Sequence, residues 1–214
     1  MHIDIFSDVI CPWCFIGKRR LERALVERPQ PSLSVRWRAF QLNPDMPMEG
    51  MDRTTYLDRK FGGRENAARV YNAIQQAGAQ EGIAFDFERI RRTPNTLPAH
   101  QLIAFAGDAG DQDPLVEQLF RLYFFEGADI GDPEVLIQAA ADSGLDSDAA
   151  RKCLANNTGL EAAQAEDMQA RRAGIQGVPT FILNGRYSLS GAQEPEVLFQ
   201  LFDVAREESK EATS

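Results

Sequence analysis

The chain has 214 residues, of which 43% are hydrophobic, 26% are charged and three are cysteines. A chain of this length can bury a full core without cross-links, and three cysteines are too few and too odd in number for a disulfide framework. The formal net charge of −9 argues against a nucleic-acid partner, and the absence of any run of about 18 apolar residues argues against a membrane span.

The start of the chain predicts a β-α-β unit. Residues 2–7 are a strand candidate, and residues 12–27 predict a helix. Pro12 suits the first turn of that helix, because the N–H that proline lacks has no partner there. Residues 33–39 alternate apolar and polar side chains, which is the period of a half-buried strand.

From about residue 52 to 173 the signals are helical, with no segment that resembles a strand for long. Residues 180–183 and 186–189 then predict two strands. Asn184-Gly185 between them is the preferred two-residue hairpin turn. The chain therefore returns to β structure after a long helical stretch.

A final helix is predicted over residues 194–205, followed by a polar, frayed tail from residue 206 onward. The pattern predicts an α/β fold in which residues 1–46 and 174–214 form one discontinuous domain. Residues 47–173 are then an inserted all-helical subdomain. Such an insertion is tolerated because the entropy of loop closure grows slowly with loop length.

The motif Cys11-Pro12-Trp13-Cys14 stands at the junction of the first strand and the first helix. A thiolate attacks a disulfide, and a free cysteine is mostly protonated at neutral pH. Unpaired N–H groups and the macrodipole at a helix start stabilise negative charge, which favours the thiolate of Cys11. Cys14 follows three residues later on the same helical face, where it can attack a mixed disulfide formed on Cys11. We therefore expect Cys11 to be an exposed nucleophile and Cys14 to be the resolving thiol.

A zinc site and a structural disulfide are the alternatives for this pair. Zinc would need two more ligands, and none of His2, His100 and Cys153 has zinc-site spacing, so no metal is expected. A structural disulfide is unusual in the cytoplasm, where we place the protein because no basic segment followed by an apolar one opens the sequence. A redox role is the better interpretation.

Four further features need an interpretation. Val178-Pro179 predicts a rigid turn before a strand, and X–Pro bonds readily become cis. The backbone of Val178 can then pair with an extended partner. An ordinary proline at the edge of a strand is the alternative. His100 can be a site residue or a structural histidine, and Cys153 a small core side chain. The basic cluster Lys18-Arg19-Arg20 is predicted to be a solvated helix face.

These motifs together resemble the DsbA-like branch of the thioredoxin superfamily. The string from Phe6 to Gly17, the string Gly177-Val178-Pro179-Thr180-Phe181, and Asn95-Thr96 with Ala99-His100 are similar to the FrnE-like subgroup. The resemblance covers essentially the whole chain. It implies a thioredoxin-like fold with a helical insertion.

The resemblance also implies roles for individual residues. Cys11 and Cys14 would be the catalytic pair, and Pro179 would be a cis-proline facing them, with Val178 offering its backbone to the substrate. The related 2-hydroxychromene-2-carboxylate isomerases and kappa-class glutathione transferases carry serine where this chain has Cys11, and use glutathione. The presence of both cysteines here favours dithiol–disulfide exchange.

We therefore expect a thiol–disulfide oxidoreductase that acts on a disulfide- or thiol-containing protein or small molecule. The substrate-binding surface would include Trp13, Val178, Pro179 and His100. No cofactor is expected to be tightly bound, with glutathione as a candidate redox partner. A glutathione-linked isomerase or transferase of small molecules in secondary metabolism is the alternative enzyme, and a redox-sensing binding protein is the alternative that is not an enzyme.

Overall fold

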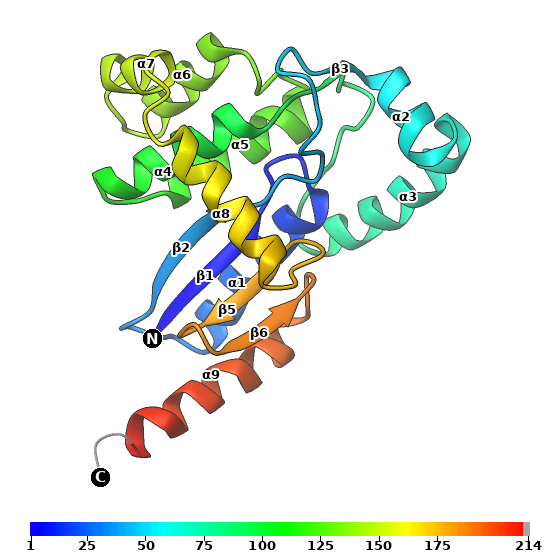
Figure 1. Ribbon diagram of the computed structural model, residues 1–214. Helices are drawn as coiled ribbons and strands as arrows, with labels where there is room; N and C mark the ends of the chain where they lie inside the picture. Colours follow the sequence, from blue (N-terminus) through cyan, green and yellow to red (C-terminus); the bar gives the residue numbers. More distant parts are fainter. Residues whose placement is uncertain (212–214) are drawn as a thin grey trace.

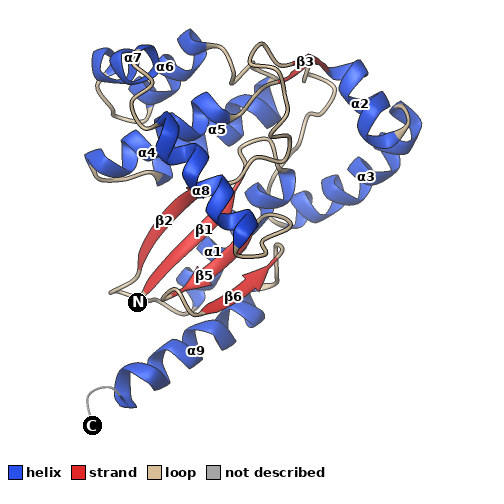
Figure 2. Cartoon of the chain, in the orientation of Figure 1, coloured by secondary structure: helices blue, strands red, loops and turns tan. Residues whose placement is uncertain are grey.

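A computed structural model describes the backbone of residues 1–211 and the side chains of residues 1–207. The fold is built on a four-stranded sheet with the order β2-β1-β5-β6 (Figures 1 and 2). Its strands are β1 (His2–Ser7), β2 (Ser34–Ala39), β5 (Thr180–Leu183) and β6 (Tyr187–Ser190). Strands β1 and β2 are parallel, and the other neighbours are antiparallel. The two ends of the chain thus share one sheet.

The sheet confirms the sequence prediction of a β-α-β opening and a β-β-α close. Helix α1 (Pro12–Glu27) connects β1 to β2 and lies behind the sheet in Figure 1. Helix α9 (Pro195–Glu211) packs against α1. Asn184 and Gly185 both have positive φ, 51° and 68°, as the predicted hairpin turn requires.

The prediction for the end of the chain was wrong in one respect. Helix α9 continues to Glu211, so the backbone of residues 206–211 is helical instead of frayed. Residues 212–214 of the predicted tail lie outside the described residues.

The segment between β2 and β5 supplies the remaining helices and is helical apart from one short ribbon. In chain order the elements are β3 (Met51–Asp52), α2 (Arg53–Phe61), α3 (Arg64–Gln80), β4 (Arg92–Thr93), α4 (Leu97–Ala109), α5 (Asp113–Arg121), the π-helical turn η1 (Leu122–Glu126), α6 (Pro133–Asp142), α7 (Ser147–Ala155) and α8 (Leu160–Arg172). Strands β3 and β4 pair with each other, away from the main sheet. The α/β prediction with an inserted helical part is confirmed, while the boundaries after residues 46 and 173 stay a prediction.

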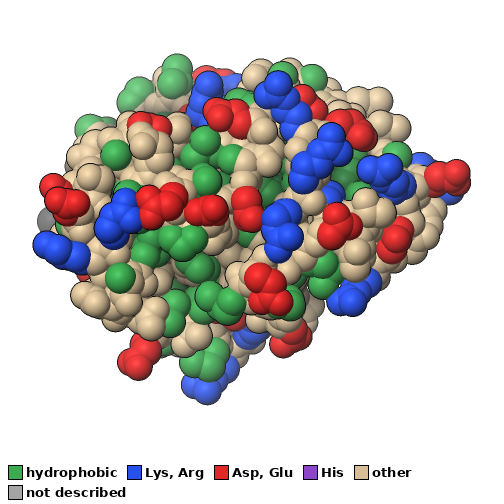
Figure 3. Space-filling view, turned by 90° about the horizontal axis from the view of Figure 1, so that it is seen from above, with side chains coloured by type: hydrophobic (Ala, Val, Ile, Leu, Met, Phe, Trp, Pro, Cys, Tyr) green, Lys and Arg blue, Asp and Glu red, His purple; other side chains and the backbone are tan. Residues whose placement is uncertain are grey.

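Helices of this segment cover one face of the sheet and lie beyond its upper end in Figure 1. Helix α8 crosses the sheet on the side opposite α1, and α4 contacts both α8 and β2 (Figure 1). Helices α2 and α3 lie to the right of the sheet in Figure 1, and α3 contacts α1. Seen from above, acidic and basic side chains are interspersed over this helical surface (Figure 3).

One hydrophobic core runs through both parts of the molecule, and Phe15 of α1 lies where they meet. Its ring is fully buried and stacks on Phe120 with 4.9 Å between ring centroids. Phe85 and Phe124 lie 6.1 and 6.3 Å from it. The insertion therefore packs directly on the helix that carries the dithiol.

The basic cluster of α1 is not the solvated face that was predicted. Lys18 is only 3% exposed and forms ion pairs with Glu22, with Asp113 at 2.9 Å and with Glu117 at 3.3 Å. Burial alone would lower the pKa of Lys18, but these carboxylates raise it, so the ammonium stays charged. Arg20 pairs with the buried Glu81 at 2.9 Å. The prediction of a solvated face was wrong because carboxylates from the insertion give each buried cation a partner.

Replacing Phe15 with alanine should lower the free energy of unfolding by about 3–5 kcal/mol, since a fully buried phenylalanine leaves a large cavity. Val26→Ala on the same helix is the control: Val26 is 80% exposed, and a change within about 0.5 kcal/mol is expected. Urea unfolding followed by circular dichroism measures both. Equal effects of the two substitutions would contradict the packing described for Phe15.

Candidate active site

The dithiol lies on the first turn of α1. Cys11 is the N-cap residue, with φ −92° and ψ 112°, and Pro12 is the first helical residue. The N–H of Cys11 donates to the carbonyl of Asp8 at 2.9 Å, and the N–H of Cys14 donates to the carbonyl of Cys11 at 3.0 Å. The loop after β1 and the proline at the helix start thus hold both cysteines in one turn.

The two thiols are free and differ in access. Cys14 is fully buried, whereas Cys11 is 4% exposed and borders a cavity of about 260 Å³. Cys11 is therefore less open than the sequence prediction of an exposed nucleophile. Its thiol is covered by the loop before β5, and its Sγ–H donates to the carbonyl of Val178 at 3.6 Å.

Cys14 is held as a neutral thiol. Burial raises its pKa well above the ordinary cysteine value, and the neighbouring Cys11 raises it further through a hydrogen bond and through charge. A buried thiolate would lack water around it, so the protonated form is favoured. Cys14 must lose a proton before it can attack a disulfide.

The peptide bond between Val178 and Pro179 is cis, and Pro179 lies directly against α1. A Cβ atom added to Gly17 would stand 2.9 Å from Cγ of Pro179 and 3.4 Å from Cζ of Phe181. Only glycine permits this approach of helix and loop. Gly17 is therefore part of the site's framework. Gly17 ends the motif that begins at Phe6, but the sequence pattern predicted no role for it.

Three of the predicted site residues meet at one cavity. Trp13 is 38% exposed and lines the cavity beside Cys11, and the half-buried Val178 lines it from the opposite loop. Pro179, the next residue in the chain, is buried. The structure thus brings together segments more than 160 residues apart.

His100 does not reach this surface. It is 3% exposed, and its Nε2 lies 3.5 Å from Oδ1 of the fully buried Asp8. Neither of these two atoms has a hydrogen-bond partner among the described residues. His100 can act only from beneath the dithiol loop, so the sequence prediction that it offers contact surface is not supported by its position.

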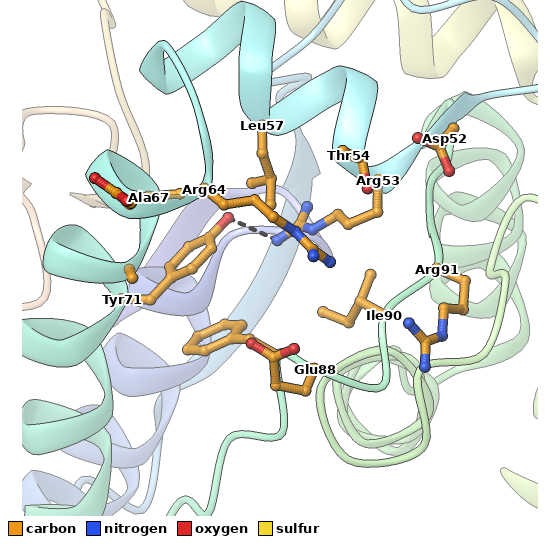
Figure 4. Close-up of a pocket in the computed structure, with 13 residues that line it drawn as sticks. Asp52, Arg53, Thr54, Leu57, Arg64, Ala67, Tyr71, Glu88, Ile90 and Arg91 are labelled. Atoms are coloured by element: carbon orange, nitrogen blue, oxygen red, sulfur yellow. Dashed lines mark hydrogen bonds between the residues drawn. The ribbon is translucent and has the colours of Figure 1, made fainter.

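The far wall of the cavity was missed by sequence reasoning. It comes from α2, α3 and η1, and its polar members include Arg53, Tyr56, Lys60, Tyr71 and Tyr123. Helical periodicity predicted the helices but contained no signal that these side chains face Cys11. A neighbouring hollow of about 400 Å³ shares Arg53 and Tyr71 but contains neither cysteine of the dithiol (Figure 4).

Among the described side chains, no group of three or more His, Cys, Asp or Glu residues could hold a metal ion. A reduced dithiol whose first sulfur, that of Cys11, borders a cavity, with a cis-proline loop across from it, is an arrangement suited to disulfide exchange.

Comparison with known proteins agrees with this chemistry. The DSBA-like thioredoxin domain family matches residues 2–203, and the chain belongs to this family. A crystal structure of a probable DsbA oxidoreductase from Streptomyces coelicolor is 31% identical, with 97% of this chain and 91% of that chain covered and a TM-score of 0.87. The thioredoxin-like fold and the predicted relationship are thereby confirmed. The family and the fold indicate an enzyme of the thiol–disulfide oxidoreductase or isomerase type.

Two more distant structures share the fold. The cytosolic disulfide reductase DsbM from Pseudomonas aeruginosa, solved with GSH, is 19% identical, with 97% and 100% of the two chains covered and a TM-score of 0.68. A 2-hydroxychromene-2-carboxylate isomerase is 17% identical, with 100% and 98% covered and a TM-score of 0.70. Both agree with the resemblance expected from the sequence motifs.

Gly17→Ala should destabilise the protein by about 1–3 kcal/mol, because the new methyl group meets the rigid ring of Pro179. Gly177→Ala in the facing loop is a matched control, since a Cβ there meets nothing within 4 Å. Denaturant unfolding of the two variants measures the difference. If Gly17→Ala costs no more than Gly177→Ala, the close packing of α1 on Pro179 is wrong.

The raised pKa of Cys14 predicts slow, base-dependent alkylation. In a Cys11→Ser, Cys153→Ser variant, burial still raises the pKa of Cys14, so less thiolate is present at any pH than in a free cysteine. The iodoacetamide rate should therefore keep rising with pH past the ordinary value of about 8.5. A plateau below that pH, measured by mass spectrometry, would contradict the assignment.

Proposed function

We propose that this protein is a thiol–disulfide oxidoreductase in which Cys11 is the nucleophile and Cys14 the resolving thiol. The observation that carries the proposal is the difference in access within one helical turn. Cys11 borders the cavity, and Cys14 is completely buried behind it. A substrate disulfide can reach the first sulfur and not the second.

The exchange proceeds in two balanced steps. The thiolate of Cys11 attacks one substrate sulfur and forms a mixed disulfide, while the other substrate sulfur leaves as a thiolate. Cys14 then loses its proton and attacks the sulfur of Cys11. The Cys11–Cys14 disulfide forms, the second substrate thiolate leaves, and two electrons have passed to the substrate. The reverse sequence oxidises a dithiol.

The loop across the site supports substrate binding. The carbonyl of Val178 accepts the Sγ–H of Cys11, which places the backbone of this residue beside the reacting sulfur. We propose that the backbone of Val178 pairs with an extended part of the substrate. Pro179 holds the loop against α1, and Trp13 offers an exposed apolar face at the cavity rim.

Glutathione is a candidate redox partner, because the related DsbM has been solved with GSH. A glutathione-linked isomerase or transferase is the second candidate function, supported by the fold shared with 2-hydroxychromene-2-carboxylate isomerase. The two functions differ in their need for Cys14. Dithiol exchange requires it, whereas isomerisation would survive its loss.

The cytoplasmic location expected from the sequence stays a prediction, which cell fractionation can check. Within residues 1–211, no helix is both long and apolar enough to cross a membrane.

Cys14→Ser should trap a mixed disulfide on Cys11, because the group that releases the substrate is gone. Non-reducing electrophoresis and mass spectrometry of the purified variant identify the trapped partner. Cys11→Ser is the control and should capture nothing, as Cys14 is buried. Capture by Cys14 in that control would reverse the roles, and turnover by Cys14→Ser would favour the isomerase.

A further inference from the structure

The cavity in front of Cys11 has an unusual balance of charge. Its wall is largely aromatic and aliphatic, with contributions from Phe61, Phe87 and Phe124. Two cationic side chains, Arg53 and Lys60, also line it, and none of the described residues on this wall is Asp or Glu. A cavity of this kind attracts an anion with an apolar body.

Arg53 is half-buried and held by neutral groups. Its guanidinium donates to the hydroxyls of Tyr71 at 2.6 Å, Thr93 at 3.0 Å and Tyr123 at 3.5 Å. Burial raises the pKa of both Tyr71 and Tyr123, so these hydroxyls are uncharged and leave the positive charge uncompensated. Figure 4 shows the hydrogen bond from Arg53 to Tyr71.

Three other arginines with well-defined partners show the contrast. Arg20, Arg38 and Arg151 each pair with at least one carboxylate. Among the side chains that the structure describes, no carboxylate forms an ion pair with Arg53 or Lys60; Lys60 instead lies over the ring of Tyr56, 5.2 Å from its centroid. The two cations at the cavity are therefore available to a ligand.

The neighbouring hollow lacks this imbalance. Arg64 and Arg91 line it together with Arg53, but so do three acidic residues, Asp52, Glu65 and Glu88. Figure 4 shows Glu88 together with these three arginines among the residues that line the hollow. The charge balance thus directs an anion toward Cys11 and away from the larger hollow.

We propose that the substrate is a low-molecular-weight apolar disulfide, or its thiol, that bears a carboxylate. The carboxylate binds Arg53, with Lys60 nearby, the apolar body lies on the aromatic wall, and the sulfur meets Cys11. The volume of about 260 Å³ lies just below the roughly 300–1,000 Å³ typical of small-molecule pockets, so the ligand must be small. An arginine fork binds a carboxylate through two hydrogen bonds. This inference rests on the proposed exchange at Cys11 and Cys14. The dithiol passes two electrons to the substrate disulfide in the same two steps.

The net charge of −9 makes the test informative. A protein with this charge repels anions on average, so a preference for a carboxylate must arise from local cations.

Pre-reduced protein is mixed in single-turnover stopped flow with the disulfide of para-mercaptobenzoate or with that of para-mercaptobenzamide. Each rate constant is divided by that of the same disulfide with mercaptoethanol, which removes the difference in intrinsic reactivity.

The wild type should prefer the carboxylate over the amide. Arg53→Gln should lower this ratio at least about tenfold, the effect of losing a charge-assisted hydrogen bond. Lys60→Gln should lower it less, up to about fivefold, because Lys60 is exposed. Arg69→Gln is the control, since Arg69 is an exposed residue of α3 that does not line the cavity. It makes the same change in net charge and should leave the ratio unchanged.

The outcomes separate this inference from the proposed function. If the wild type reduces neither disulfide, dithiol exchange itself fails. If it reduces both at equal normalised rates, or if the ratio in Arg53→Gln and Lys60→Gln equals that in Arg69→Gln, the substrate class is wrong and dithiol exchange stands. Should Arg53→Gln unfold, the exposed Lys60 still decides the question.

Discussion

The first two turns of α1 are enclosed from two sides, and the site depends on that enclosure. Gly17 lies against Pro179 and Phe181 on the sheet side. Phe15 stacks on the phenylalanines of the insertion on the other side. Because the helix is packed on both faces, Cys11 is held where the cavity begins and Cys14 is sealed behind it. The access to Cys11 and the burial of Cys14 therefore both follow from the packing of α1.

Charge pairing holds the same helix in place. Lys18 and Arg19 reach carboxylates of α5, and Arg20 reaches the buried Glu81 after α3. Buried ion pairs of this kind add little net stability, but removing one partner leaves an unpaired charge in a poorly solvated place. They therefore act mainly to specify how the insertion sits on α1. That placement decides which aromatic and cationic side chains of the insertion face the dithiol.

Local sequence rules predicted the elements nearest the dithiol well. The proline at the start of α1 and the Asn184-Gly185 turn each depend on neighbours in the chain, so their signals are complete in the sequence. The alternation predicted the strand β2, but Val35 is 37% exposed, and only Trp37 and Ala39 are buried as the pattern expects. The extension of α9 to Glu211 was missed because a polar composition alone does not distinguish a solvated helix from a frayed end. The sequence left open whether His100 is a site residue or a structural histidine, since periodicity does not reveal which face of a helix turns inward.

The sequence by itself determined the chemistry: two cysteines on one helical turn after a strand, with a proline-containing loop far downstream. It also determined the family, because those motifs occur in a distinctive combination. Only the tertiary structure decided the difference in access between Cys11 and Cys14, the fit of Gly17 against Pro179 and the uncompensated charge of Arg53. Each of these depends on distances between segments remote in the chain, and such distances are set by packing of the whole core instead of by local residue patterns.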